Sequence, residues 1–196
     1  MKAFKDFDKV QAAGTPRAKL PAGGYVGKVI GAKVVEYNGR NGVFERLEIA
    51  LDITEGEYAG YYKNDFDNNT NEDRKWRGVC RLYVPTDDGS DKDEITKRIF
   101  KGMVVAFEES NSSFHWDWDE SKLKGLTVGM LVRDKEYDIE GRRGFAPEIF
   151  KLVDVDYIRK GKFEIPATKL LNGSTAPAGS TSSAAQTAET DDDYPF

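Results

Sequence analysis

Residues 44–54 read FERLEIALDIT, and this stretch decides the fold class more clearly than any other. Its side chains alternate, so that leucines and isoleucines share one face while mostly charged residues share the other. A period of two is typical of a β-strand that buries one face and exposes the opposite one. The stretch therefore predicts a half-buried strand in a mainly β protein.

The residues before this strand predict its partner. Residues 25–37 are rich in valine and isoleucine, which favour extended structure. Residues 38–42 read NGRNG, and their two Asn-Gly steps suit the positive φ of a tight turn. Gly27 and Gly31 favour a bent or bulged strand, as a small barrel requires. We expect an antiparallel hairpin here.

The next segments predict a third strand and a helix. Residues 55–63 are expected to turn into a strand that ends near Phe66. Residues 76–84 either continue that strand after a polar loop or add another. Asp91 is expected to be the N-cap of a helix and to form a capping box with Glu94. Its buried stripe would repeat every four residues, at Ile95, Ile99, Met103 and Phe107.

Two further strands are expected over residues 130–137 and 145–158, joined by a turn with a basic tip. The order of hairpin, third strand, helix and hairpin is that of a five-stranded OB-fold barrel with one helix between strands three and four. We expect an N-terminal arm, an OB-fold domain, a flexible linker and a tip, with a disordered C-terminal tail. Their ranges are residues 1–19, 20–165, 166–188 and 189–196.

Composition excludes several classes of protein. Four of the 34 acidic residues lie in the tail, which leaves 30 acids against 29 Lys and Arg in residues 1–171. A nucleic-acid surface must then be a local patch. Cys80 and His115 are single, so neither a disulfide framework nor a zinc cluster is expected. The sequence shows no signal peptide or membrane span, and we expect an intracellular protein without a metal or cofactor.

Motifs of catalysis are missing from the sequence. We find no Walker loop, no nucleophile elbow, no zinc-protease motif and no dinucleotide fingerprint. We therefore expect no catalytic residues and no enzyme activity. A nuclease that holds magnesium with Asp and Glu alone stays open as an alternative.

Residues 189–196 read ETDDDYPF and combine carboxylates with two aromatic rings. The carboxylates repel one another and proline lacks an N–H, so the octet cannot build structure alone. A partner with a basic rim and an apolar pocket would fit it. We predict a docking peptide, although a solvating acidic tail is the alternative. Its residues are Asp191, Asp192, Asp193, Tyr194, Pro195 and Phe196.

This tip resembles the acidic C-terminal peptide of bacterial and phage single-stranded DNA-binding proteins, with Tyr194 where the bacterial proteins usually carry an aliphatic residue. The body, over roughly residues 15–156, resembles a phage family of OB-fold single-stranded DNA-binding proteins. The matching stretches are LPAGGY at residues 20–25, LEIALDI at 47–53 and EGEYAG at 55–60.

The resemblance implies a protein that binds and protects single-stranded DNA in the cytoplasm of an infected bacterial host. It would act in DNA replication, recombination or repair, and recruit replication or recombination proteins through the tip. The oligomeric state stays open, a homo-oligomer included. A second hypothesis is a protein-interaction adaptor to which DNA is irrelevant.

Binding a single strand without sequence preference needs rings that stack on bases and cations that follow phosphates. On an OB-fold, strands two and three and the loops joining strands one–two and four–five usually carry them. Core packing is an equally good interpretation of Tyr61 and Tyr62. The candidates are Tyr37, Arg40, Phe44, Arg46, Tyr61, Tyr62, Lys63, Phe66, Arg74, Lys75, Trp76, Arg77, Arg142 and Arg143.

Trp116 and Trp118 form a different kind of candidate. They alternate with the acidic residues Asp117 and Asp119, which would repel phosphate. We therefore interpret the two tryptophans as packing over the helix or as a surface for a protein partner.

Overall fold

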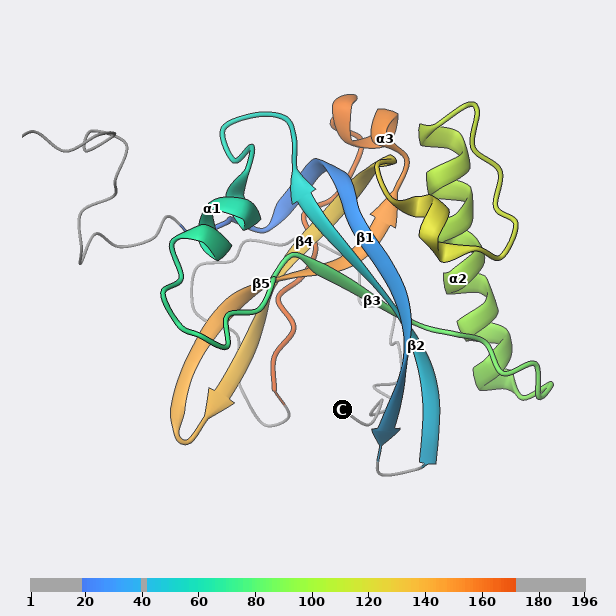
Figure 1. The fold of residues 1–196 in the computed structure, drawn as a ribbon, viewed down its shortest axis with the longest axis horizontal. Coiled ribbons are helices and arrows are strands. Elements are labelled where there is room, and N and C mark those ends of the chain that lie inside the picture. Colours follow the sequence, from blue (N-terminus) through green and yellow to red (C-terminus); the bar gives the residue numbers. More distant parts are fainter. Residues whose placement is uncertain (1–18, 40–41, 172–196) are drawn as a thin grey trace, which may run out of the picture.

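The computed structural model describes residues 19–39 and 42–171, which form one five-stranded antiparallel sheet with helices around it (Figure 1). The strands are β1 (Gly23–Gly39), β2 (Gly42–Ile53), β3 (Val79–Tyr83), β4 (Thr127–Ile139) and β5 (Arg142–Val153). The helices are α1 (Tyr61–Asp67), α2 (Asp91–Ser110), α3 (Val155–Arg159) and the 3-10 turn η2 (Glu120–Leu123).

The strand order in the sheet is β3-β2-β1-β4-β5, so β3 and β5 form its two edges. The mainly β class and the helix between the third and fourth strands are confirmed. The expected closed barrel is not confirmed, because the described residues of β3 and β5 form no ladder with each other. β3 has only five residues, all paired with β2, and so offers little length for closure.

The first hairpin is confirmed and is longer than expected. Tyr37 lies opposite Phe44, and Gly39 lies opposite Gly42 at the turn. The register shifts between Val29 and Gly31, which confirms the expected irregularity in this strand. Figure 1 shows this hairpin and the β4–β5 hairpin extending in the same direction from the sheet, with their ends apart.

The expected third strand ending near Phe66 is wrong, because residues 61–67 form α1. Gly60, at φ 75°, turns the chain where a strand would continue. One carboxylate oxygen of Asp52 then accepts hydrogen bonds from the N–H groups of Ile53 and Tyr62, at 3.0 and 2.9 Å. The third strand of the sheet is β3, within the segment 76–84 that was expected to continue or add a strand.

Helix α2 begins one residue earlier than expected, and of its expected stripe Met103 and Phe107 are buried. Ser90 is the N-cap and accepts from the N–H of Asp93 at 3.1 Å. Ile95 and Ile99 are exposed, because a spacing of four residues drifts by about 40° per step around an α-helix. The buried residues instead follow the spacing of three and four, at Phe100, Met103, Val104 and Phe107.

The last strand ends at Val153 rather than continuing to Ile158, because the chain turns into α3. Val155 and Ile158 lie one turn apart on this helix and pack against Val26 and Leu131. That contact buries apolar groups which an extended chain would place on opposite faces.

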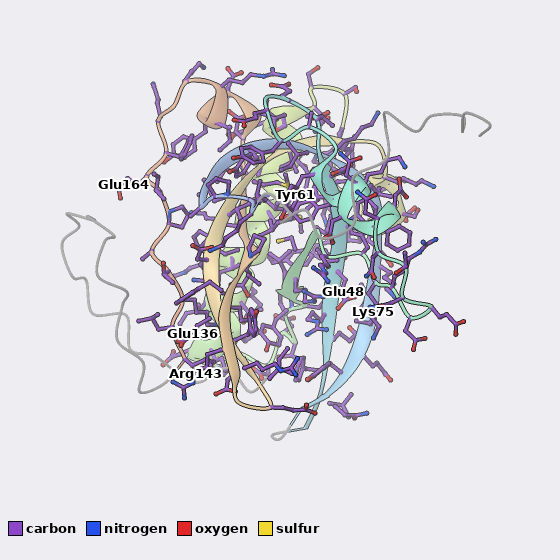
Figure 2. The ribbon with its side chains drawn as sticks, turned by 90° about the vertical axis from the view of Figure 1, so that its left-hand side faces the viewer. Glu48, Tyr61, Lys75, Glu136, Arg143 and Glu164 are labelled. Atoms are coloured by element: carbon purple, nitrogen blue, oxygen red, sulfur yellow. The ribbon has the colours of Figure 1, made fainter. Side chains whose placement is uncertain are left out.

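The chain after α3 returns along β4 and extends the fold past residue 165 (Figure 2). Lys169 forms a parallel β-bridge with Lys135. Its backbone N–H donates to the backbone carbonyl of Asp134, and its own carbonyl accepts from the N–H of Glu136, both at 2.8 Å. The side chain of Glu136 accepts from the N–H of Leu171 at 3.0 Å. The expected arm up to residue 18, the linker from 172 and the tip lie outside the described residues.

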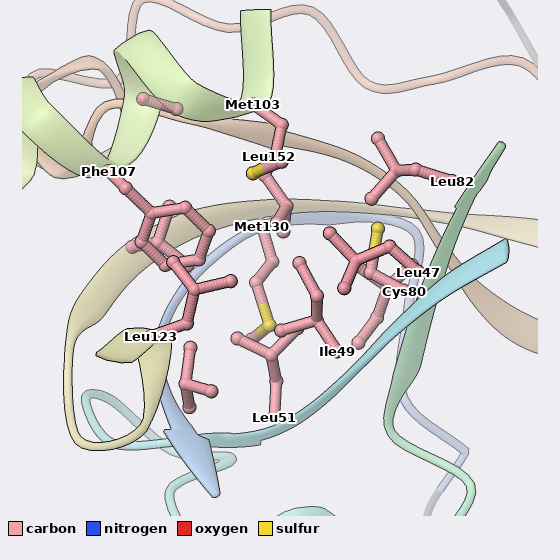
Figure 3. Packing of buried hydrophobic residues seen from close by; sticks show 14 of the residues in the cluster. Leu47, Ile49, Leu51, Cys80, Leu82, Met103, Phe107, Leu123, Met130 and Leu152 are labelled. Carbon is pink, nitrogen blue, oxygen red and sulfur yellow. The ribbon is translucent and has the colours of Figure 1, made fainter. Parts of the chain in front are cut away.

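The core lies between the curved sheet and α2 (Figure 3). The alternating face of β2 contributes Leu47, Ile49 and Leu51, all fully buried, as the sequence pattern predicts. Met103 and Phe107 reach the same cluster from α2. Across the described ranges, no helix is long and apolar enough to cross a membrane.

Candidate functional site

A cleft of about 320 Å³ lies where the two edges of the sheet, β3 and β5, approach each other. Strands β2 to β5 and the segment after α3 all contribute to this β3–β5 cleft, so no short stretch of sequence contains it. Its lining residues are Arg46, Val79, Arg81, Tyr83, Arg133, Lys135, Glu148, Ile149, Phe150 and Lys169.

The β3–β5 cleft has an excess of positive charge. Glu148 binds Arg133 at 2.8 Å and Lys135 at 2.9 Å. Just outside the lining, Glu48 binds Arg46 at 2.7 Å and Arg81 at 3.3 Å. Together with Lys169, the cleft has five cations against these two carboxylates. Such an excess attracts a polyanion such as a nucleic-acid backbone.

The two carboxylates orient the cations and stay ionised. Burial by itself would raise the pKa of Glu148, but its hydrogen bonds to Lys135 and Arg133 outweigh burial and lower it. The pKa of Glu48 is lowered in the same way, with burial opposed by Arg46 and Arg81. Each carboxylate therefore holds two cationic side chains in place at neutral pH.

A row of aromatic rings continues from the cleft along the first hairpin. The ring centroids of Tyr37 and Phe44 are 5.1 Å apart, and those of Phe44 and Tyr83 are 4.9 Å apart. The guanidinium of Arg46 lies 4.7 Å from the centre of the Tyr37 ring. On the other wall, Arg133 lies 4.7 Å from the centre of the Phe150 ring. The cleft thus combines flat surfaces with cations.

The second group of predicted residues forms a separate cluster, residues 61–77, which we call the α1 loop cluster. Phe66 packs against Trp76 at 5.7 Å, and Arg74 lies 4.7 Å from the centre of the Phe66 ring. The indole N–H of Trp76 donates to the carbonyl of Leu51 at 3.0 Å. Tyr62 is 2% exposed and belongs to the core. These contacts are internal to the fold.

The α1 loop cluster is electrically neutral, because its four cations are matched by four acids. Lys63 binds Asp67 at 2.5 Å, and Arg77 binds Asp65 at 3.5 Å. Glu72 and Asp73 directly precede Arg74 and Lys75 in the chain. The basic side chains are exposed, but the cluster as a whole has little attraction for a polyanion.

The structure therefore brings together only some of the predicted residues. Arg46 lines the β3–β5 cleft, and Tyr37 and Phe44 lie beside it in the row of rings that ends at Tyr83. Arg142 and Arg143 lie at the exposed end of the β4–β5 hairpin, where Arg143 binds Asp138 at 2.9 Å. Figure 2 shows Arg143 and Lys75 on opposite sides of the view. Arg40 lies outside the described residues.

The sequence interpretation missed most of the cleft, namely Arg81, Tyr83, Arg133, Lys135, Phe150 and Lys169. One signal was present in β3, where Cys80 and Leu82 are buried and the alternate residues Arg81 and Tyr83 are not. A period of two therefore identifies the outward-facing residues of a strand. It cannot identify which other strand they will face.

The arrangement can bind phosphate oxygens through Arg and Lys and stack on bases through its rings. No group of three or more His, Cys, Asp or Glu that could hold a metal ion is found in the part of the chain that the structure describes. No protein-family model matches the chain, and no curated protein matches it significantly.

Proposed function

We propose that the chain is a single-stranded DNA-binding protein that binds without sequence preference through the β3–β5 cleft. The observation that carries the proposal is the excess of cations beside the ring row Tyr37, Phe44 and Tyr83. Cations following phosphates and rings stacking on bases are the two requirements of such binding.

The connectivity of the sheet supports this proposal. The order β3-β2-β1-β4-β5, with α2 between β3 and β4, is the order of an OB-fold, whose sheet commonly binds oligonucleotides. We infer an OB-fold-like domain whose edges β3 and β5 remain apart and leave the cleft between them.

The chemistry of the cleft favours a single strand over a duplex. Phosphates would contact Arg81 and Lys135, while bases would stack on Phe44 and Tyr83. The flat faces of bases are available only when the bases are unstacked, so the aromatic row adds nothing to duplex binding. Each stacked base contributes about 1 to 3 kcal/mol.

The biological setting is part of the same proposal. The protein would coat exposed strands during replication, recombination or repair in the cytoplasm of an infected bacterial cell. The tip, residues 191–196, would recruit replication or recombination proteins by its aspartates and its terminal aromatic residue. A homo-oligomer is compatible with this role, but the proposed role does not depend on oligomerisation.

The test is fluorescence anisotropy of a labelled oligo-dT titrated with the full chain, with a duplex of equal length as control. We expect tight binding to the single strand only. The logarithm of the association constant should fall with the logarithm of salt concentration with a slope of about −0.7 per phosphate neutralised. The variant Arg81→Ala should make the slope less steep by about 0.7, and Lys75→Ala should not change it.

Failure of the full chain and of a chain ending at Ala188 to bind oligo-dT, even at low salt, would contradict the proposal. The protein-interaction adaptor would then become the leading hypothesis. Degradation of the oligonucleotide that stops on addition of a chelator would instead indicate the magnesium-dependent nuclease.

A further inference from the structure

A second hollow, of about 420 Å³, lies between α2 and the loop over residues 112–119, on elements that do not line the β3–β5 cleft. We call it the Trp pocket. Its walls are mostly apolar and include Val84, Phe100, Val104, Trp116 and Trp118, with Lys101 at its border. Neither DNA binding nor the core requires a hollow here.

The rings of the Trp pocket are only partly packed. Trp116 contacts Phe100, with centroids 6.0 Å apart, and Trp118 contacts Trp116 at 6.2 Å. Trp118 is nevertheless 80% exposed, and its backbone has a φ of 68°, which is unusual for a bulky residue. The indole N–H of Trp116 is buried and has no acceptor among the described residues. An exposed tryptophan beside an unsatisfied donor indicates a surface that awaits an occupant.

Acids also lie beside the Trp pocket, but Asp87 is paired with Lys97 and Asp117 is paired with Lys122. Lys97 is already engaged by Asp87, Asp93 and Glu94, at 2.6, 3.0 and 3.2 Å. Arg98 and Lys101 lie one turn apart on α2, are exposed, and form no ion pair within residues 19–39 and 42–171. The Trp pocket thus combines an apolar hollow with Lys101 at its border, and Arg98 lies one turn away on the same helix.

We propose that the Trp pocket is the docking site of the chain's own C-terminal octet, residues 189–196. Phe196 or Tyr194 would pack on the rings of Trp116 and Trp118, where aromatic pairs and buried area both contribute. The aspartates before them would bind Arg98 and Lys101. The octet supplies both an apolar group for the hollow and carboxylates for Arg98 and Lys101.

The length of the chain permits this docking. Twenty-five residues follow Leu171, and an extended chain of that length spans up to about 80 Å. A compact chain of this size has a radius of gyration of about 16 Å, so the octet can reach any part of the surface. Docking would keep the octet away from both the β3–β5 cleft and an external partner until the pocket releases it.

The three tryptophans allow a direct test by NMR of their indole N–H groups in the full chain. Shortening the chain to end at Ala188 should shift the signals of Trp116 and Trp118 and leave Trp76, in the α1 loop cluster, unchanged. A synthetic octapeptide added to the shortened chain should reverse the shifts. Tenfold dilution of the full chain should not change its spectrum, because docking within one chain is independent of concentration.

A charge reversal sharpens the test. Lys101→Glu should weaken binding of the octapeptide to the shortened chain about tenfold, and an octapeptide with Asp191 and Asp192 replaced by lysine should recover affinity for this variant. Lys75→Glu is the matched control and should leave binding unchanged. Thermal unfolding of each variant separates loss of docking from loss of folding.

Three outcomes would overturn the proposal: unchanged Trp116 and Trp118 signals, shifts confined to residues of the β3–β5 cleft, or shifts that vanish on dilution. The second outcome would mean that the octet docks on the cleft, and the third that it docks on another copy. None of them bears on oligo-dT binding by the cleft, so this proposal and the proposed function can fail separately.

Discussion

The α1 loop cluster and the β3–β5 cleft both combine aromatic and basic side chains, but only the cleft has an excess of positive charge. In the cluster, four cations and four acids lie within 17 consecutive residues. In the cleft, cations from several strands face two carboxylates. A run of basic and aromatic residues in the sequence is therefore a poor guide to a charged surface, because neighbouring acids cancel it.

The rings of the two regions also differ in what they contact. Tyr62 is buried and Trp76 is hydrogen-bonded to the backbone of β2, so these rings hold α1 against the sheet. Phe44 and Tyr83 are half-buried and form a row that leads into a cleft. Four predictions separate the two roles, from the largest expected effect to the smallest.

The largest effect is expected from Tyr62→Ala, which should lower the free energy of unfolding by about 3 to 5 kcal/mol through the cavity it creates. Tyr62→Phe is the matched control. It should be neutral or stabilising, because the buried hydroxyl has no hydrogen-bond partner among the described residues. Chemical denaturation measures both. If Tyr62→Ala instead left stability intact and weakened DNA binding, the ring would be a ligand contact.

The next effect is on DNA affinity. Arg81→Glu combined with Lys135→Glu should weaken oligo-dT binding on the order of 100-fold at 150 mM salt, because phosphate contacts become repulsive. Arg74→Glu with Lys75→Glu makes the same change of charge in the α1 loop cluster. It should cost less than about threefold, since the Debye length is near 8 Å.

Thermal unfolding should show both double variants folded. The alanine versions, Arg81→Ala with Lys135→Ala, should give a smaller loss in the same direction. An equal loss of oligo-dT affinity in the two charge-reversed variants would place the α1 loop cluster in the binding surface. The sequence-based prediction that Arg74 and Lys75 bind DNA would then hold.

A smaller effect is expected from removing a stacking ring. Phe44→Leu keeps an apolar side chain between Tyr37 and Tyr83 but loses the flat face, and should weaken oligo-dT binding about fivefold to tenfold. Phe66→Leu in the α1 loop cluster should not change the affinity. Anisotropy titrations at one salt concentration compare the two. A larger loss for Phe66→Leu would reverse the assignment of the two regions.

The smallest effect is that of pH. The pKa values of Glu48 and Glu148 are lowered in the folded chain, and the cleft contains no histidine. Its charge is then constant between pH 8 and pH 5.5, and oligo-dT affinity should change less than about twofold. Since both pKa values are lowered, their ion pairs stabilise the fold above the ordinary glutamate pKa of about 4.3 and lose this contribution as the pH falls below it.

Local patterns predicted much of the fold. The alternation in residues 44–54 and the NGRNG turn predicted the first hairpin, and both strands are present. The helix between the third and fourth strands was predicted from its cap and apolar residues, although its stripe was assigned with a spacing of four. The third strand was misplaced, because the aromatic residues that suggested a strand at 61–66 are needed by a short helix covering the sheet.

The candidate site was predicted only where it is local. Tyr37, Phe44 and Arg46 come from one hairpin, so alternation and turn position were enough to select them. Arg81, Arg133 and Lys169 come from three separate segments and meet only because the edges of the sheet approach each other. A periodic pattern within one segment carries no information about which residues of another segment will lie close to it.

By itself, the amino-acid sequence determined the mainly β class, the hairpins and the acidic aromatic end of the chain. These depend on neighbouring residues, whose side-chain directions follow from the backbone period. Only the tertiary structure decided which cations face one another, which rings are buried, and where an apolar hollow stays open beside α2. Those properties depend on the curvature of the sheet and on contacts between residues far apart in the chain, which no local pattern specifies.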